Sequence, residues 1–389
     1  MENFVYFNPT KILFGRGQVQ NVGRETALHA KKALLLYGGG SIKKTGLYGA
    51  ITASLKEQGV VYVEQGGIKP NPEIASVRQG VTTCRREGIS FILAVGGGSV
   101  IDAAKAIAAG VDYDGDPWDF FDKKAVPKNP IPIGVVLTLS ATGSEANGNA
   151  VVSNPSTHEK RPIYHPLLHP KFSILDPELT YTVSAEQTAY GAVDTLSHVY
   201  EQYFHHVESS PIQDGFCETI MRAVIANAPL AIENPADYNA RANLMWASTL
   251  ALNNLLGAGA KGDWASHMIE HELSAHYGIA HGAGLAIVFP AWMTHVYKAN
   301  PARFRRFAEK VWDVDTGGMT GEQAAIAGIE AMKGFYRNNL RIGVTMKDYG
   351  MDGSKISVMA PSAMKFRSIG NFVTLTKEDI EEIYKKALG

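Results

Sequence analysis

The first 180 residues alternate between short apolar runs and segments with helical periodicity. Ala33–Tyr37, Val60–Val63, Phe91–Val95 and Ile131–Leu139 are the apolar runs. Continuous apolar runs of this length are typical of buried parallel strands, because helices cover both faces of such a sheet. Strands that alternate with helices predict parallel βαβ units and a doubly wound sheet.

Beyond about Thr180 the pattern changes, and nearly every segment has the period of a helix. Helices are expected at 236–256, 263–277 and 282–299 among others, and 158–170 is expected to form an exposed loop or hairpin. A chain of 389 residues is too long for one compact core. We therefore predict an α/β plus all-α protein. Its domains are a doubly wound dinucleotide-binding domain at 1–180 and a helical metal-binding, catalytic domain at 181–389.

Composition narrows the class of protein. The chain has 37 basic and 38 acidic residues and a formal net charge of −1, so neither a nucleic acid nor an anionic membrane is indicated as a partner. Cys84 and Cys217 are its only cysteines, which excludes a disulfide framework and a thiolate metal cage. The first residues lack a signal pattern, and no apolar run approaches about 18 residues. We expect a cytoplasmic protein.

A run of three glycines, Gly96–Gly98, and Ser99 lie between a predicted strand and an alanine-rich helix. Glycine lets the backbone approach a pyrophosphate closely, and a helix N-terminus offers unpaired N–H groups. Asp102, expected in the first turn, can cap N–H groups or hold a ribose. The alternative is a tight turn without a ligand, since the run is not the usual dinucleotide fingerprint.

A second loop of this kind, Gly38-Gly39-Gly40-Ser41, is followed by Lys43 and Lys44. In a doubly wound sheet such a loop meets the adenosine ribose, where a carboxylate favours NAD and small residues with cations favour NADP. No carboxylate is present in this loop, which favours NADP(H) over NAD(H). The alternative is that the two lysines are solvated surface charges.

The end of the strand at 131–139 is rich in hydroxyl groups, from Thr138, Ser140, Thr142 and Ser144. These groups are suited to bind a nicotinamide amide or phosphate oxygens. Capping of the next helix accounts for them equally well.

Histidines and one aspartate recur at helical spacing in the second half of the chain. Asp194 and His198 are four residues apart, as are His267 and His271, and His281 is expected on a bend just past a helix end. Three imidazoles and a carboxylate can enclose a divalent metal ion. The alternative is a set of scattered helix histidines, but polar groups in this apolar region are costly unless they are paired.

Taken together, the motifs resemble those of the iron-containing (group III) alcohol dehydrogenases, in the branch of butanol dehydrogenases and NADPH-dependent aldehyde reductases. The resemblance spans essentially the whole chain. It rests on Phe14-Gly15, Lys69-Pro-Asn71-Pro72, the run from Gly96 to Lys105, Thr138 to Glu145, Asp194-x-x-x-His198, and His267-x-x-x-His271-x9-His281-Gly282. The last two motifs are the specific ones.

The resemblance implies roles for individual residues. The metal ligands of the family fall on Asp194, His198, His267 and His281, and His271 matches a histidine near the metal and the nicotinamide. We take His271 as the candidate catalytic residue, which relays a proton, although hydrogen bonding alone explains it equally well. The implied cofactor contacts are Gly38, Gly39, Gly40, Ser41, Asn71, Gly97, Gly98, Ser99, Thr138, Asn147 and Lys160; Asp102, Ser140 and Thr142 join them from the motifs above.

The expected reaction is hydride transfer between NADP(H), or alternatively NAD(H), and a small primary alcohol or aldehyde such as butanol and butyraldehyde. One divalent metal ion is expected, Fe(II) by family habit, with Zn(II) as the alternative. The family implies a homodimer. The competing function is a metal- and nucleotide-dependent lyase or cyclising synthase that resembles dehydroquinate synthase. Such an enzyme needs a dense basic set around its metal, and the metal segments carry only Arg241 and Lys261.

Overall fold

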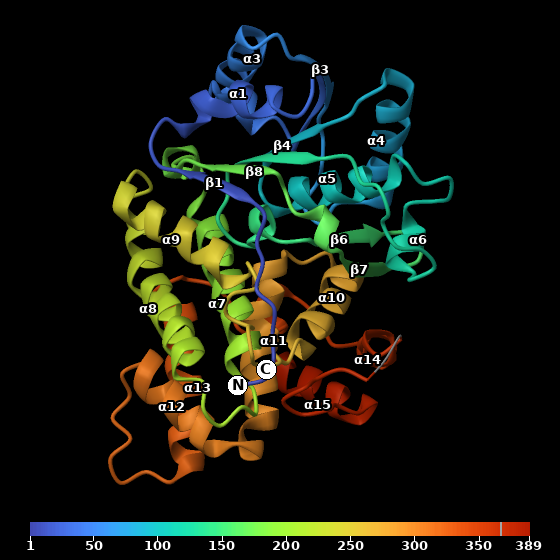
Figure 1. The fold of residues 1–389 in the computed structure, drawn as a ribbon. Helices are drawn as coiled ribbons and strands as arrows, with labels where there is room; N and C mark the ends of the chain where they lie inside the picture. Colours follow the sequence, from blue (N-terminus) through green and yellow to red (C-terminus); the bar gives the residue numbers. More distant parts are fainter. Residues whose placement is uncertain (366–367) are drawn as a thin grey trace. The chain divides into compact units, whose positions relative to one another are not determined.

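The computed structural model describes residues 1–365 and 368–389, which divide into two compact units (Figure 1). The sheet unit comprises Phe7–Val183 and Pro235–Asn253. The helical unit comprises Met1–Tyr6, Ser184–Asn234 and Asn254–Gly389. The predicted fold class, a doubly wound α/β region followed by a helical region, is confirmed.

Within the described residues, the sheet unit contains a six-stranded sheet of order β1-β8-β5-β4-β2-β3, in which all neighbouring strands are parallel. The strands are β1 (Lys11–Phe14), β2 (Lys32–Tyr37), β3 (Val61–Gln65), β4 (Ile92–Gly96), β5 (Ile133–Leu137) and β8 (Phe172–Leu175). Val95 of β4 lies opposite both Tyr37 of β2 and Val136 of β5. The loops that follow these three strands therefore leave the sheet along one edge, where doubly wound folds bind their ligands.

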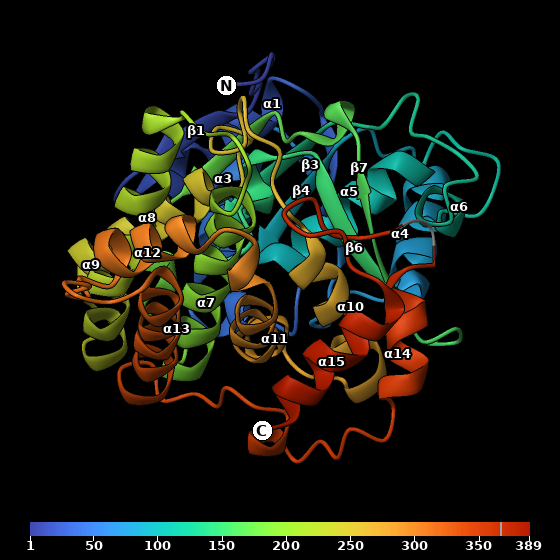
Figure 2. The same ribbon diagram turned by 90° about the horizontal axis from the view of Figure 1, so that it is seen from below.

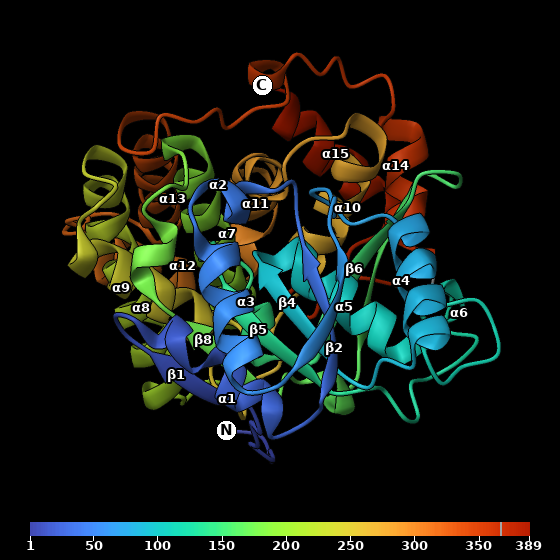
Figure 3. The ribbon, with the colours of Figure 1, turned by 90° about the horizontal axis from the view of Figure 1, so that it is seen from above.

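Strand β2 shows why its sequence is apolar at nearly every position. Leu34 and Leu36 belong to the core under α4 (Ile74–Glu87) and α5 (Gly98–Gly110), whereas Leu35 belongs to the core under α1 (Val22–Ala27) and α3 (Leu47–Glu57). Figure 3 shows α3 and α5 on the two sides of the strands. Each fully buried leucine contributes about 2 kcal/mol. The sheet is thus covered on both faces, as the apolar runs predict.

A hairpin and one late helix complete the sheet unit. Strands β6 (Asn149–Asn154) and β7 (Glu159–Tyr164) pair in antiparallel fashion, so the segment predicted as a loop or hairpin is half of a hairpin. Helix α9 (Tyr238–Ala251) lies in the sheet unit, although its sequence pattern groups it with the C-terminal helices. The Thr249 hydroxyl donates to the buried Glu145 carboxylate at 2.6 Å, which ties α9 to the loop after β5.

The helical unit is built around α11 (His281–Val296), which packs against α7 (Ala185–Tyr203), α10 (Ala265–Tyr277), α13 (Gly321–Asn338) and α15 (Lys377–Leu388) (Figure 2). Most α11 side chains are buried, including Leu285 and Phe289. A Cβ at Gly282 would lie 2.2 Å from the Tyr190 carbonyl oxygen. Glycine is therefore required for α11 to begin this close to α7. The remaining helices of the unit are α8 (Pro211–Glu233), α12 (Pro301–Val311) and α14 (Ile356–Ala363).

Local signals set where these helices begin. The Ser184 side chain caps α7 by accepting a hydrogen bond from Gln187 N, and Pro211 occupies the first position of α8. By length and composition α8 could cross a membrane, a test that core helices of soluble proteins also pass. Its Asp214 pairs with Arg303 of α12 at 2.6 Å, which anchors α8 within the unit.

Candidate metal and nucleotide sites

Three of the four predicted metal ligands come together in the helical unit. The ligand atoms of Asp194 on α7, His267 on α10 and His281 at the start of α11 all lie within 4.8 Å of one another. His281 does not lie on a bend, as its flanking glycines suggested, but is the first residue of α11. Three separate helices thus bring one carboxylate and two imidazoles to a common point, which suits a divalent cation without thiolate ligands.

His198, the fourth predicted ligand, lies beside this triad. Its ring stacks on the His267 ring with centroids 4.8 Å apart, and its Nδ1 lies 3.5 Å from Asp194 Oδ1. Burial, and then the neighbouring His267 and His281, hold the pKa of His198 well below its usual range. A neutral imidazole is the form that binds a metal ion. His198 is therefore neutral and lies next to the triad, and its role as the fourth ligand stays a prediction.

Glu201, which motif reasoning missed, holds His267 from α7. Its buried carboxylate accepts hydrogen bonds from His267 Nδ1 at 2.8 Å, from His267 N at 3.0 Å and from Trp264 N at 2.5 Å. Trp264 has a left-handed backbone with φ 63°, which is uncommon for a non-glycine residue. Glu201 thus fixes both the start of α10 and the orientation of the His267 ring.

Glu270 plays the same part for His281. Its buried carboxylate pairs with His281 Nδ1 and accepts from the Ser274 hydroxyl at 2.5 Å. The ligand atoms of Glu270, His271 and His281 also lie within 4.8 Å of one another, and the His271 and His281 rings are 5.7 Å apart. His271 therefore borders the predicted metal site, as the sequence predicts for a residue that acts next to the metal.

The chemistry of these groups fits a divalent metal ion. His267 Nε2 is buried and makes no hydrogen bond within the described part of the chain, while its Nδ1 is taken by Glu201. A buried imidazole nitrogen without a partner is costly unless an ion or water completes it. The orphaned nitrogen points to a bound group at the triad.

The loops predicted to bind a nucleotide meet at one edge of the sheet. Gly97 and Gly98 begin α5 directly after β4, and Thr138 N donates to the Gly96 carbonyl at 3.1 Å. A Cβ at Gly98 would lie 2.4 Å from the Thr142 side chain. Only glycine therefore permits this approach of the loops after β4 and β5, next to the N-terminus of α5, where the positive end of a helix favours an anion.

The ribose loop and the Asn71 turn join the same edge. Gly38, the first residue after β2, accepts from Gly67 N at 2.9 Å, and a Cβ there would lie 3.7 Å from Val100 of α5. Asn71 has a left-handed backbone with φ 51°. Its neighbour Pro72 accepts from Ser153 N at 2.8 Å, and Ser153 pairs with the buried Lys160 across the hairpin. Gly38 to Ser41, Asn71 and Lys160 are thus carried by neighbouring segments.

Three predicted cofactor residues instead contact the protein's own loop between β5 and β6. Asp102 accepts from the Ser144 hydroxyl at 2.7 Å and from Val151 N at 3.0 Å. The amide of Asn147 donates to the Gly143 and Leu252 carbonyls at 2.8 and 3.0 Å. Thr142 accepts from Ser144 N at 3.2 Å, the capping role that its spacing also allowed. A direct contact of these side chains with a cofactor stays a prediction, as does one from Ser140, Ser99 or Thr138.

The buried Lys105 explains why this loop is rigid. Its ammonium donates to Ser144 O, Ser144 Oγ, Asn147 Oδ1 and Asn149 O at distances between 2.6 and 3.1 Å. Burial lowers the pKa of Lys105 to about 8 and raises the pKa of the neighbouring Glu145 carboxyl. A lysine at this depth is retained only with several partners. It fastens the loop after β5 from beneath.

The ribose loop itself contains no carboxylate, but Glu64 of the neighbouring strand β3 places one next to it. Lying on β3, it accepts from Lys43 Nζ at 3.1 Å and from the Tyr37 hydroxyl at 2.9 Å, and it pairs with the Tyr48 hydroxyl. The Lys43 ammonium also lies over the Tyr37 and Tyr48 rings. The Tyr48 hydrogen bond contributes most to lowering the pKa of Glu64. Lys43 therefore lies at the surface and is paired with Glu64 there.

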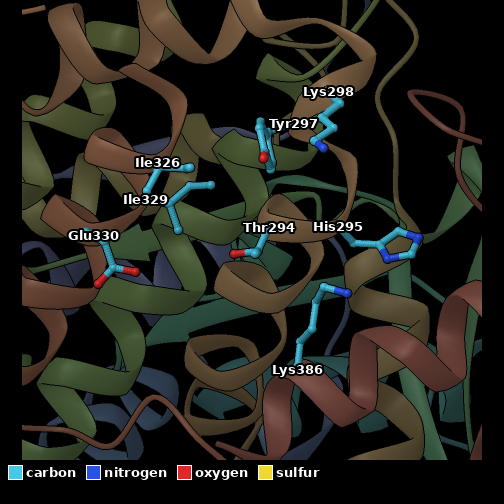
Figure 4. A pocket seen from close by; sticks show the side chains of 8 residues that line it. All are labelled: Thr294, His295, Tyr297, Lys298, Ile326, Ile329, Glu330 and Lys386. Carbon is cyan, nitrogen blue, oxygen red and sulfur yellow. The ribbon is translucent and has the colours of Figure 1, made fainter. Parts of the chain in front are cut away.

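The helical unit has a further pocket of about 440 Å³ between the end of α11, α13 and α15 (Figure 4). It is lined by Thr294, His295, Tyr297, Lys298, Ile326, Ile329, Glu330 and Lys386. None of the predicted site residues lines it. This pocket is therefore separate from the predicted metal ligands.

Comparison with known proteins decides between the two enzyme classes. The family model described as "Iron-containing alcohol dehydrogenase" matches residues 9–177. The model described as "Fe-containing alcohol dehydrogenase family, C-terminal" matches residues 188–388. The chain belongs to the iron-containing alcohol dehydrogenases. The predicted family is confirmed, and the lyase alternative is set aside.

Several similar proteins lie in the predicted branch. Probable NADH-dependent butanol dehydrogenase 1 of Bacillus subtilis is 47% identical over 100% of both chains. The NADPH-dependent aldehyde reductase YqhD of Escherichia coli is 41% identical over 92% of both chains. The crystal structure of NADH-dependent butanol dehydrogenase A from Thermotoga maritima matches with a TM-score of 0.96 at 46% identity, over 100% of this chain and 99% of that one. This iron-containing alcohol dehydrogenase is an oxidoreductase of alcohols and aldehydes.

Proposed function

We propose that this alcohol dehydrogenase reduces short aldehydes to primary alcohols with NADP(H) and one divalent metal ion. The observation that carries the proposal is the convergence of Asp194, His267 and His281 within 4.8 Å, with the orphaned His267 Nε2 among them. A single carboxylate in the triad leaves about one unit of positive charge on a dication. Such a site can polarise an oxygen atom.

The bound groups and the protein would divide the chemistry. When bound, the metal ion polarises the carbonyl oxygen as a Lewis acid and the reduced nicotinamide supplies the hydride. Asp194, His198, His267 and His281 would hold the metal, for which we propose Fe(II), with Zn(II) as the alternative. The backbone N–H groups at Gly97–Ser99 would bind the pyrophosphate at the start of α5.

His271 is the proposed proton relay. Its ring lies 5.7 Å from that of His281, on the same helix as His267. Imidazole is the side chain whose unperturbed pKa lies nearest neutrality, so it can pass a proton to the alkoxide formed on reduction. Replacement of His271 by alanine should lower kcat and leave metal affinity within about threefold of the original.

NAD(H) is the second candidate cofactor, and Glu64 is the observation that favours it. The absence of a carboxylate at Gly39 supports NADP(H), as does the position of Lys43 and Lys44 directly behind the loop. The Glu64 carboxylate opposes this, because it neutralises Lys43 and adds negative charge near the place of a 2′-phosphate. Glu64→Gln should therefore lower the KM for NADPH several-fold and leave the KM for NADH unchanged.

The decisive experiment follows NADPH and NADH oxidation with butyraldehyde. Chelator-stripped protein is re-supplied anaerobically with Fe(II) or Zn(II), beside Asp194→Ala and His267→Ala. We expect metal-dependent turnover with NADPH preferred, lost in both variants. Preference for NADH would retain the reaction and overturn the cofactor assignment. Undiminished turnover by the stripped protein would refute the metal mechanism.

A homodimer and a cytoplasmic location remain predictions, which size-exclusion chromatography and cell fractionation would test.

A further inference from the structure

Glu201 and Glu270 occupy matching positions relative to the predicted metal ligands. Glu201 follows His198 by three residues on α7, and Glu270 follows His267 by three residues on α10. Each contacts the next predicted metal ligand along the chain. The Glu201 carboxylate forms a hydrogen bond with Nδ1 of His267, and the Glu270 carboxylate pairs with Nδ1 of His281.

We propose that Glu201 and Glu270 are positioning residues that set the tautomer and the orientation of His267 and His281 for metal binding. The inference rests on the proposed metal-dependent function. A carboxylate accepts a hydrogen bond, so each ring nitrogen that faces one carries the proton. The proton is then on Nδ1, and Nε2 keeps the lone pair that a metal ion needs.

The arrangement of the second nitrogen agrees with this. His281 Nε2 lies 3.7 Å from Asp194 Oδ1, and His267 Nε2 has no hydrogen bond among the described residues. Both Nδ1 atoms therefore face a carboxylate, and His267 Nε2 is left for another partner at the triad.

Both carboxylates are themselves held in place. Glu201 is fully buried, and the backbone N–H groups of Trp264 and His267 fix its two oxygens. Glu270 is also fully buried, and the Ser274 hydroxyl donates to its other oxygen. Each carboxylate is therefore fixed opposite the ring nitrogen that it faces.

The test measures metal affinity and tautomers separately from turnover. Glu201→Gln, Glu201→Ala and Glu270→Gln are prepared metal-free, and Zn(II) affinity is measured by competition with a chromogenic chelator. Loss of such an outer partner costs about 10- to 100-fold in metal affinity. We expect about 10-fold weaker binding for the glutamine variants and more for alanine. The visible absorption of the Co(II)-loaded protein should also shift, because the ring orientation changes.

Nitrogen NMR of the metal-free protein gives the direct readout. In the wild type His267 and His281 should carry their proton on Nδ1, and in each alanine or glutamine variant the affected ring should become a mixture of tautomers. A purely structural glutamate would leave the tautomer unchanged. Glu218→Gln is the matched control, since this partly buried carboxylate in the same unit pairs with Tyr203 and Arg306. It should alter neither readout.

The outcomes separate this inference from the proposed function. If the wild type binds no Zn(II) or Co(II), the proposed metal site itself fails. If the wild type binds but Glu201→Ala and Glu270→Gln bind within twofold of it with unchanged tautomers, only the positioning roles fail. Circular dichroism and the unfolding free energy of each metal-free variant show whether a loss of metal affinity reflects loss of the fold. If the alanine variant is unfolded, the metal affinities and tautomers of the glutamine variants decide whether the glutamates position the rings.

Discussion

Two glycines, Gly284 and Gly39, leave space at the predicted metal site and at the predicted ribose loop. A Cβ at Gly284 on α11 would lie 2.6 Å from Glu270 Oε1, so the carboxylate that holds His281 fits only because this residue has no side chain. At Gly39 a Cβ would meet nothing within 4 Å. One glycine is thus required by packing, and the other leaves open space where a cofactor can lie.

Gly284→Ala should displace the Glu270 carboxylate and weaken metal binding about 10-fold, as loss of an outer hydrogen-bond partner does. Chelator competition measures the change. Gly215→Ala on α8 is the control, because a Cβ there meets nothing within 4 Å and alanine favours a helix by up to about 1 kcal/mol. Equal metal affinity in both variants would show that Glu270 can move without consequence.

Gly39→Asp should reverse the cofactor preference. The new carboxylate would accept from the 2′-hydroxyl of NADH and repel the 2′-phosphate of NADPH. We expect kcat/KM for NADPH to fall about 10-fold or more relative to NADH, measured with butyraldehyde at fixed metal loading. Gly39→Ala fills the same space without charge and should change the ratio little. A ratio that stays constant in the aspartate variant would place the ribose away from this loop.

At the scale of elements, α5 does two things in the sheet unit. Its N-terminus carries the glycines of the predicted pyrophosphate loop, and its Lys105 binds the loop after β5 from below. These roles are linked, because the approach of Gly98 to Thr142 holds only while that loop stays in place. The element that binds the phosphate therefore also supports its neighbour.

Lys105→Met should destabilise the protein by about 3 kcal/mol, since removal of a buried charged donor leaves its acceptors unsatisfied. Urea unfolding at neutral pH measures the difference. Lys56→Met on α3 is the control, because this lysine is exposed and such substitutions usually change stability by less than about 0.5 kcal/mol. A loss no larger than that of the control would contradict the supporting role.

The same lysine gives a pH dependence of known sign. Burial lowers its pKa to about 8 from the ordinary lysine value of 10.5, so between these values the unfolded chain binds more protons than the folded one. The contribution of Lys105 to the free energy of unfolding therefore rises with pH across this window. The destabilisation caused by the buried charge is greatest below the window, where the lysine is protonated in the folded protein. The stability gap between wild type and Lys105→Met should widen by about 2 kcal/mol from about pH 8 to pH 10. A constant gap would mean that the buried amine keeps an ordinary pKa.

At the scale of the whole molecule, the predicted metal-binding residues and the predicted nucleotide-binding residues belong to different compact units. Asp194, His198, His267 and His281 lie in the helical unit, whereas the glycine loops at Gly38–Gly40 and Gly96–Gly98 lie in the sheet unit. Each predicted site therefore draws these residues from a single unit. The metal ion and the nucleotide should each stabilise the unit that holds it.

Hydrogen exchange followed by mass spectrometry tests this division. At about 1,000 times the dissociation constant a ligand stabilises its site by about 4 kcal/mol. Zn(II) should slow locally exchanging amides of α7, α10 and the start of α11, and NADPH should slow those at the ends of β2 and β4. The apo protein with each ligand alone, and with Mg(II) as a mismatched ion, provides the comparison. Protection by Zn(II) that is confined to β2 and β4 would exclude the metal site.

Most of the fold could be predicted from local pattern. Continuous apolar runs predict buried parallel strands, and Leu34, Leu35 and Leu36 are all buried, in alternation between the cores on the two faces of the sheet. The exceptions are residues whose environment is made by distant segments. β6 is partly polar rather than continuously apolar, and α9 has an ordinary helical period, so neither pattern reveals the Glu145–Thr249 contact that ties α9 to the sheet unit.

The sequence by itself determined the family, the doubly wound sheet and the residue types that can bind a metal ion. These depend on periodicity and on spacing within single helices, which local chemistry fixes. Only the tertiary structure decided that Glu201 and Glu270 face the ring nitrogens of His267 and His281, and that Glu64 engages Lys43. Such pairs join residues up to 66 positions apart, and the packing of separate helices and strands alone brings them within hydrogen-bond distance.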